Sequence, residues 1–203
     1  QNHKFIYQYN DKGKLVDEKT EYDERGNKIK WRSFDNEFGT EENYRSVYDM
    51  DGNEIERYQI DESDKVIHSQ KYKYDNKGNK IETLSFFKWQ KGPYTDTFKY
   101  NNKGNLTESV SYDTSQNITS KQNIIYNEKG NKIELNEYDG SGLVKMETYK
   151  YDDQDNLIES RTYDGQGKLN YRQTFKFDEK GNEIEFIRFA TSPSGFNRFM
   201  CRF

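Results

Sequence analysis

The chain has 203 residues, and its 32 basic and 36 acidic side chains nearly cancel to a net charge of −4. This balance provides no basic stripe for nucleic acid, and no apolar run approaches the roughly 18 residues that a membrane span needs. The 17 Tyr and 13 Phe residues supply the apolar area that a folded chain buries. We therefore expect one folded domain over residues 1–203, with no nucleic-acid partner and no membrane span.

The composition favours strands and turns over helices. Alanine occurs once, at Ala190, whereas Tyr, Thr, Ile, Phe, Asn and Gly are abundant. Alanine is the best helix former, whereas the six abundant residue types are typical of strands and turns. We expect an all-β fold.

A repeat of strict period defines the architecture. An aromatic residue followed by Asp or Asn, and three residues later by Gly-Asn, recurs at spacings of 26, 26, 26, 26, 25 and 26. The aromatic residues of this first series are Tyr22, Tyr48, Tyr74, Tyr100, Tyr126, Tyr151 and Phe177. A looser second series lies between them, at Tyr9, Phe34, Ile60, Phe86, Tyr112, Tyr138 and Tyr163.

Each half-repeat has 12 to 14 residues, which is room for one short strand and a tight turn and too little for a helix. The period therefore predicts a long antiparallel β-meander of about 15 short strands, built from 26-residue double-hairpin repeats. A sheet of that many strands is expected to be twisted or curled.

The first-series turn, read in the copy from Tyr74, has a backbone explanation. Asp75 suits the first position of a type I turn, and Gly78 suits the left-handed residue that ends it. Asp155 replaces this glycine in one copy, and aspartate tolerates the left-handed conformation. We interpret Asn79 as a turn-stabilising amide. The face that Ile81 joins depends on the register: a two-residue connection places it beside the aromatic ladder, and a glycine-bulge turn places it on the opposite face.

The recurrent Tyr-Asp-x-x-Gly, from about residue 5 to 189, resembles the YD repeats of bacterial RHS-like envelope and toxin proteins. That resemblance implies short strands in a long antiparallel sheet, which in large members encloses a toxin domain. This chain has Asn where the family often has Arg after the glycine, and it is too short to close a large shell. It is more similar to the small repeat-only proteins of bacterial envelopes.

No metal, cofactor or catalytic group stands out. The turn from Asp49 to Glu54 has its glycine at position 4, whereas a calcium-binding EF-hand loop has it at position 6. His68 has no Cys or second His nearby, so we interpret it as a solvent-facing strand residue. Glutamates such as Glu56 and Glu82 recur after the Ile position and predict salt-bridge ladders rather than a unique catalytic pair.

The copies that break the pattern are the candidate sites. Trp31 replaces a usually small or polar residue, and aromatic residues that include Phe87, Trp89 and Tyr94 overwrite one second-series turn. Such aromatics stack on sugar rings or bind a protein partner, or they plug the local sheet.

We therefore expect a non-enzymatic repeat protein, secreted or in the bacterial envelope after removal of a leader. It would act as an extended scaffold or adhesion surface that binds glycan or protein. The alternative is a glycan-active enzyme or a remnant of a toxin-encapsulating RHS-like shell. Edge strands near residues 4–9 and 196–203 predict self-association between chains.

Overall fold

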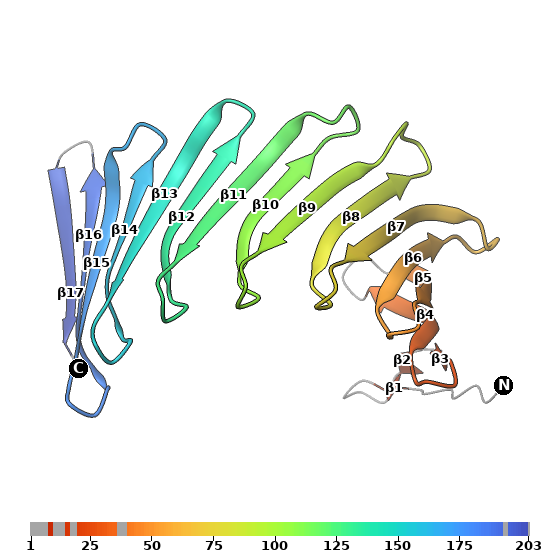
Figure 1. The fold of residues 1–203 in the computed structure, drawn as a ribbon, viewed down its shortest axis with the longest axis horizontal. Coiled ribbons are helices and arrows are strands. Elements are labelled where there is room, and N and C mark those ends of the chain that lie inside the picture. Colours follow the sequence, from red (N-terminus) through yellow and green to blue (C-terminus); the bar gives the residue numbers. More distant parts are fainter. Residues whose placement is uncertain (1–7, 10–14, 17–19, 36–39, 193–194, 203) are drawn as a thin grey trace. The chain divides into compact units, whose positions relative to one another are not determined.

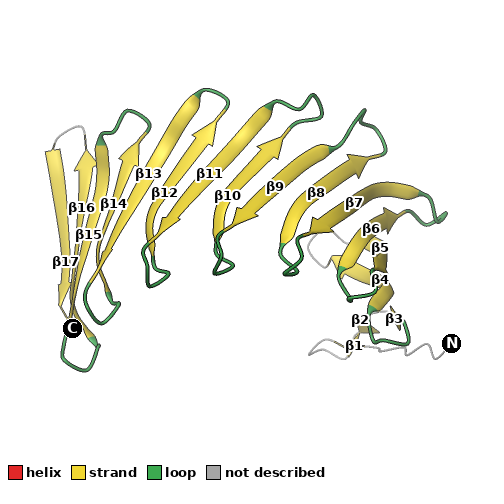
Figure 2. Ribbon diagram, in the orientation of Figure 1, coloured by secondary structure: helices red, strands yellow, loops and turns green. Residues whose placement is uncertain are grey.

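The structure, a computed structural model, describes residues 8–9, 15–16, 20–35, 40–192 and 195–202. Every helix or strand element within these ranges is a β-strand (Figure 1, Figure 2). The strands are β1 (Gln8–Tyr9), β2 (Leu15–Val16), β3 (Glu21–Tyr22), β4 (Lys28–Asp35), β5 (Thr40–Tyr48), β6 (Glu54–Ile60), β7 (Val66–Tyr74), β8 (Lys80–Phe87), β9 (Tyr94–Tyr100), β10 (Leu106–Tyr112), β11 (Ile118–Tyr126), β12 (Lys132–Asp139), β13 (Gly142–Tyr151), β14 (Leu157–Asp164), β15 (Leu169–Phe177), β16 (Glu183–Ser192) and β17 (Gly195–Arg202). The described chain holds no helix of the length and hydropathy that a membrane crossing requires.

The strands form a meander. Strands β3 to β17 follow one another in chain order in a 15-stranded sheet, and β1 pairs with β2 in a separate two-stranded sheet. Every pair whose register is described is antiparallel, for example β7 with β8 and β11 with β12. The predicted all-β meander of about 15 strands is confirmed.

The predicted edges are partly corrected. The C-terminal edge strand of the large sheet is β17, as expected, although Phe203 lies outside the described residues. At the other end the edge strand is β3. Of the predicted edge at residues 4–9, the first four residues lie outside the described ranges, and Gln8–Tyr9 pairs in the small sheet.

The contacts cluster into two units along the chain. The first unit contains residues 1–96 and 113–116, and the second contains residues 97–112 and 117–203. Strands β3 to β8 therefore belong to the first unit, and β10 to β17 belong to the second apart from the turn at 113–116. Within the second unit the strand direction turns steadily from β10 to β17 (Figure 1), which is the expected twist. A single domain over residues 1–203 stays a prediction.

The first-series turn has the glycine-bulge geometry that its chemistry favours. In the copy after β7, Gly78 donates its N–H to the Asp75 carbonyl at 3.1 Å, and Asp75 donates to the Asn79 carbonyl at 2.9 Å. Gly78 has φ of +80°, and Asp155, which replaces the glycine in its own copy, has φ of +67°. The turn thus requires a left-handed residue, whether or not that residue is glycine.

The asparagine that follows the glycine bonds to the aspartate of the same turn. Asn79 donates its backbone N–H to one oxygen of Asp75 and its side-chain amide to the other, each at 2.9 Å. The Lys77 N–H is a third donor to the same carboxylate. The interpretation of Asn79 as a turn-stabilising amide is confirmed. These hydrogen bonds, chiefly that of the Asn79 side chain, hold the pKa of Asp75 below its ordinary value.

A second register shift decides the face of the isoleucine. Tyr74 lies opposite Lys80, but Lys73 lies opposite Glu82, so Ile81 is an extra residue in β8. Since side chains alternate along a strand, Ile81 lies on the face opposite Glu82, which is the face of Tyr74. The turn has the glycine bulge that its chemistry favours, and Ile81 lies on the aromatic face that the apolar pattern favours. The expectation that a glycine-bulge turn places Ile81 on the opposite face is wrong, because the second bulge at Ile81 reverses the shift.

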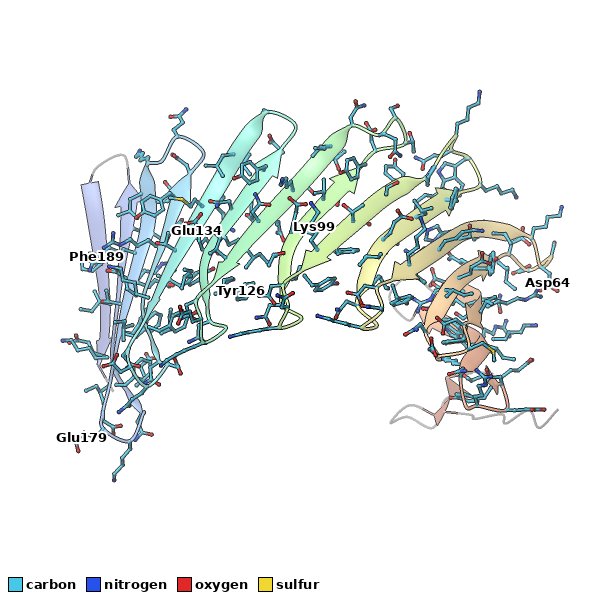
Figure 3. All side chains as sticks on the ribbon, in the orientation of Figure 1. Asp64, Lys99, Tyr126, Glu134, Glu179 and Phe189 are labelled. Carbon is cyan, nitrogen blue, oxygen red and sulfur yellow. The ribbon has the colours of Figure 1, made fainter. Side chains whose placement is uncertain are left out.

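The tyrosine of the motif joins consecutive repeats. Tyr126 (Figure 3) donates its hydroxyl to the Leu106 carbonyl at 2.9 Å, twenty residues earlier. Tyr74 and Tyr151 make the equivalent bonds, to the carbonyls of Glu54 and Lys132, each of which lies next to the bulge of the preceding repeat. Because a bulge interrupts the ladder, the hydroxyl satisfies a carbonyl where the regular pairing fails.

We predict that Tyr126→Phe lowers the free energy of unfolding by about 1 kcal/mol, because the substitution removes one hydrogen bond to a backbone carbonyl. Tyr138→Phe is the matched control, since no hydrogen bond of the Tyr138 hydroxyl occurs among the described residues. It should change stability by less than about 0.5 kcal/mol. Urea unfolding of both variants measures the difference, and equal losses would contradict the role of the Tyr126 hydroxyl.

We predict acid sensitivity from the turn aspartates. The asparagine side chain of each turn lowers the pKa of its aspartate from 3.8 in five copies, namely Asp23, Asp49, Asp75, Asp152 and Asp178. A carboxyl whose folded-state pKa is lowered contributes stability above its unfolded-state pKa, and this contribution disappears as the pH falls through the folded-state value. The urea midpoint should therefore fall as the pH drops below about 4.

A double variant, Asp75→Asn with Asp152→Asn, tests the source of this sensitivity. Asparagine already occupies the first turn position at Asn101 and Asn127, where the same backbone turn forms. The variant should therefore fold and should lose less of its urea midpoint between pH 7 and pH 3 than the parent chain. An unchanged loss would show that other carboxyl groups cause it.

Candidate functional site

A row of directly paired residues crosses five strands of the first unit on one face. Trp31 of β4 is opposite Tyr44 of β5, which is opposite Gln59 of β6, which is opposite His68 of β7, which is opposite Phe87 of β8. Directly opposite residues point to the same face of a sheet. We call these five residues the aromatic row. It contains two of the four residues predicted from the sequence, one at each end.

At one end of the row two aromatic rings stack, and two cationic side chains lie near them. The rings of Trp31 and Tyr44 have centroids 5.1 Å apart and an interplanar angle of 17°. The Lys28 ammonium lies 4.9 Å and the Arg57 guanidinium 5.6 Å from the Trp31 ring centroid. The tyrosine hydroxyl donates to the carboxylate of Glu42. Burial, and then this hydrogen bond, raise the pKa of Tyr44 to about 12, so the hydroxyl keeps its proton at neutral pH.

The other end brings together the remaining predicted residues. The rings of His68 and Phe87 stack with centroids 4.2 Å apart and an interplanar angle of 8°. Trp89 lies 5.6 Å from the Phe87 centroid, and Tyr94 meets the same ring edge-on at 6.1 Å. Trp89 is 72% exposed. This cluster therefore presents aromatic surface to solvent.

The structure corrects our interpretation of His68. The side chain is half-buried against Phe87 rather than solvent-facing, and its Nε2 atom is buried without a hydrogen-bond partner among the described residues. Burial lowers the pKa of the imidazole, so the ring is mainly neutral at pH 7.

A pocket of about 350 Å³ lies over the middle of the row. It is lined by Trp31, Glu42, Tyr44, Arg57, Gln59, His68 and Gln70. None of these described lining residues is aliphatic. The pocket therefore combines aromatic rings with amides, one carboxylate and one guanidinium.

The polar lining is held in place by hydrogen bonds. Gln59 donates its amide to Glu42 at 3.2 Å. Arg57 donates two N–H groups to the carboxylate of Glu54, at 2.9 and 2.7 Å, and these bonds raise its pKa. Gln70 accepts the Tyr72 hydroxyl at 2.8 Å. Arg57 is ion-paired with Glu54, whereas the Glu42 carboxylate accepts hydrogen bonds from neutral groups only among the described residues. The lining therefore carries one uncompensated negative charge, which disfavours an anionic ligand.

The opposite face carries the predicted charged ladders. Lys71 contacts Glu56 at 2.8 Å, and Lys73 contacts Glu82 at 2.7 Å. In the second unit the corresponding pairs are Lys150 with Glu159 and Lys176 with Glu185. The expectation of salt-bridge ladders is confirmed. No group of three or more His, Cys, Asp or Glu side chains among the described residues is arranged to hold a metal ion.

Two other pockets lie elsewhere. A pocket of about 920 Å³ against β3 to β7 has aliphatic residues such as Ile60 and Val66 in its lining, and one of about 780 Å³ lies beside the turn from Asp139 to Gly142. Neither contains a predicted site residue. Sequence reasoning did not identify Tyr44, Gln59 and His68 as members of the site. Their alignment with Trp31 and Phe87 depends on the register of the bulged strands.

The comparisons with known proteins support the fold. No protein-family model and no curated protein matches the chain. A Photorhabdus luminescens Tc holotoxin pore with a mutated TccC3 component is similar over 93% of this chain and 10% of that chain, with 14% identity and a TM-score of 0.70. A TcdB2-TccC3-Cdc42 crystal structure is similar over 94% of this chain and 12% of that chain, with 15% identity and a TM-score of 0.50.

This chain therefore spans about a tenth of each of those chains. The similarity shows a shared fold, and it supports the RHS-like resemblance of the repeat at the level of the fold.

We predict that Phe87→Ala raises the pKa of His68 toward its ordinary value of 6.5, because removal of the stacked ring hydrates the imidazole. Phe86→Ala is the matched control, since Phe86 is opposite Ser69 and so lies on the other face. An NMR titration of the imidazole protons gives the pKa, and His68→Gln assigns the signal against that of His3. A pKa unchanged by Phe87→Ala would contradict burial by this ring.

Proposed function

We propose that this chain is a non-enzymatic repeat scaffold, secreted or in the envelope of a bacterium, that binds a glycan or protein partner through the aromatic row of the first unit. One observation carries the proposal: the predicted residues Trp31 and Phe87, far apart in sequence, stand at the two ends of one row over a polar pocket. Trp89 and Tyr94 extend the aromatic surface beyond Phe87.

The repeat provides the rigid part of this arrangement. The turn hydrogen bonds and the tyrosine bonds between repeats hold the strands in register, and a site on strands is more precisely positioned than one on loops. An extended sheet of this kind displays a broad surface relative to its mass. The fold is also one that a bacterial toxin assembly contains, which supports a secreted or envelope location.

The composition of the pocket favours binding over catalysis. Glu42 is the one carboxylate among its described lining residues, whereas glycoside hydrolysis typically uses a pair of carboxyl groups on the two sides of the scissile bond. The remaining lining groups are paired amides and an ion-paired arginine. Glu56 and Glu82 belong to the ladders of the opposite face, and Glu54 is held by its ion pair with Arg57.

A second candidate has one specific observation in its favour. The similarity to a Tc holotoxin component covers 93% of this chain, so the chain is also a candidate for part of an RHS-like shell that encloses a toxin. A shell segment uses its faces to surround cargo, and it needs no pocket with paired aromatic walls. The two candidates therefore differ in what removal of the aromatics does.

We predict that Trp31→Ala and Trp89→Ala each weaken binding of a partner found on glycan or protein arrays by roughly tenfold or more, as expected for aromatic residues central to an interface. Tyr171→Ala is the matched control, because Tyr171 is an exposed aromatic in the second unit. Binding curves of the purified variants measure the effect. A partner that binds all three variants like the parent chain would exclude the aromatic row as its site.

A further inference from the structure

Two ring faces look toward each other across β6. Trp31 on β4 covers one face of the Tyr44 ring, and Phe87 on β8 covers one face of the His68 ring. The uncovered faces of Tyr44 and His68 are therefore turned toward the strand between them, β6. The residue of the row on that strand is Gln59, which lies between Tyr44 and His68 in the pairing and lines the pocket.

The width of this slot decides what fits. Neighbouring strands lie about 4.8 Å apart, so the residues on β5 and β7 are separated by about 10 Å. A flat aromatic ring stacked on both sides needs only about 7 to 8 Å, twice the optimal separation of carbon atoms. A saturated, puckered ring is thicker than a flat one and fills the larger gap. The spacing therefore favours a sugar ring over a planar base or an aromatic side chain.

The polar groups in the slot are of the kind that sugar hydroxyls need. Gln59, Gln70 and Glu42 line the pocket, and planar amides and carboxylates offer several acceptor and donor positions to neighbouring hydroxyls. The core of a protein–protein interface, by contrast, is depleted of charged residues.

The fold does not require aromatics at these positions. Three repeats further along, the equivalent row of the second unit is Ser109, Gln122, Glu137, Lys145 and Asp164. There Gln122 and Lys145 bond to Glu137, at 3.0 and 2.9 Å, so that row satisfies its own polar groups. The aromatic walls are thus particular to the first unit.

We propose that this slot binds one pyranose ring of a neutral oligosaccharide, held between the faces of Tyr44 and His68 with its hydroxyls on Gln59, Gln70 and Glu42. The inference rests on the proposed function and names its ligand. A neutral sugar is favoured over an acidic one because Arg57 is already ion-paired with Glu54, which leaves the negative charge of Glu42 uncompensated among the described lining residues.

Isothermal titration of the full chain with cellotetraose, chitotetraose and mannotetraose tests the neutral ligands. A tetramer of galacturonate represents acidic sugars, and adenosine represents a flat ring. We expect at least one neutral oligosaccharide to bind more tightly than the galacturonate tetramer and adenosine. Preference for either of those two, or binding of none of the neutral sugars, would overturn the inference.

Gln59→Ala should weaken the binding of the neutral oligosaccharide about tenfold, which corresponds to the loss of one or two hydrogen bonds. Gln122→Ala, a glutamine of the equivalent row in the second unit, should leave binding unchanged. If Trp31→Ala weakens binding and Gln59→Ala does not, the aromatic row binds its partner but the slot is not the site. The inference then fails while the proposed function stands.

Discussion

The hydrogen bonds of one carboxylate set the register of the sheet. In the turn after β7, Asp75 accepts the N–H groups of Lys77 and Asn79 and the side-chain amide of Asn79. These bonds fix a turn that requires a left-handed residue at Gly78, and the bulge at Ile81 follows directly after it. Because a shift of one residue would move every side chain to the other face, all later contacts of a strand depend on this turn.

The bulge also explains why tyrosine precedes the turn so regularly. The tyrosine hydroxyl donates to a carbonyl beside the bulge of the preceding repeat, as that of Tyr74 does at Glu54. Few hydrophobic residues are buried, namely Ile60, Tyr72 and Val110 among the described residues, and none of these is fully enclosed. Polar bonds between neighbouring repeats therefore carry a larger part of the stability than in a chain with a thick core, and cohesion depends on nearest neighbours.

The sequence predicts the fold well because the fold is repeated. Seven copies of one turn reveal the strand length, the left-handed position and the role of Asp155 as a glycine substitute. The face of Ile81 could not be decided, because two shifts of register act in succession and the sequence signals only the first. His68 was misjudged for the same reason: its contact with Phe87 comes from the pairing of β7 with β8.

The candidate site was half predicted. Trp31 and Phe87 stand out because they break a pattern, whereas Gln59 is an ordinary strand residue until its neighbours are known. Successive members of the row are 13, 15, 9 and 19 residues apart in the sequence. The spacing varies because each pair lies at a different distance from the turn that joins its two strands. No fixed spacing marks such a row in a sequence.

The two faces of the first unit divide the roles of scaffold and site. On one face Glu56 and Glu82 pair with lysines of the adjacent strands, and this arrangement recurs along the chain because the repeat supplies it. On the other face the row positions are not used by the turn, by the bulge or by the tyrosine bond. They are therefore free to vary, as the polar row ending at Asp164 shows. The recurrent residues of the repeat stabilise the backbone, so the row positions remain available for recognition. In the first unit these positions hold the aromatic walls.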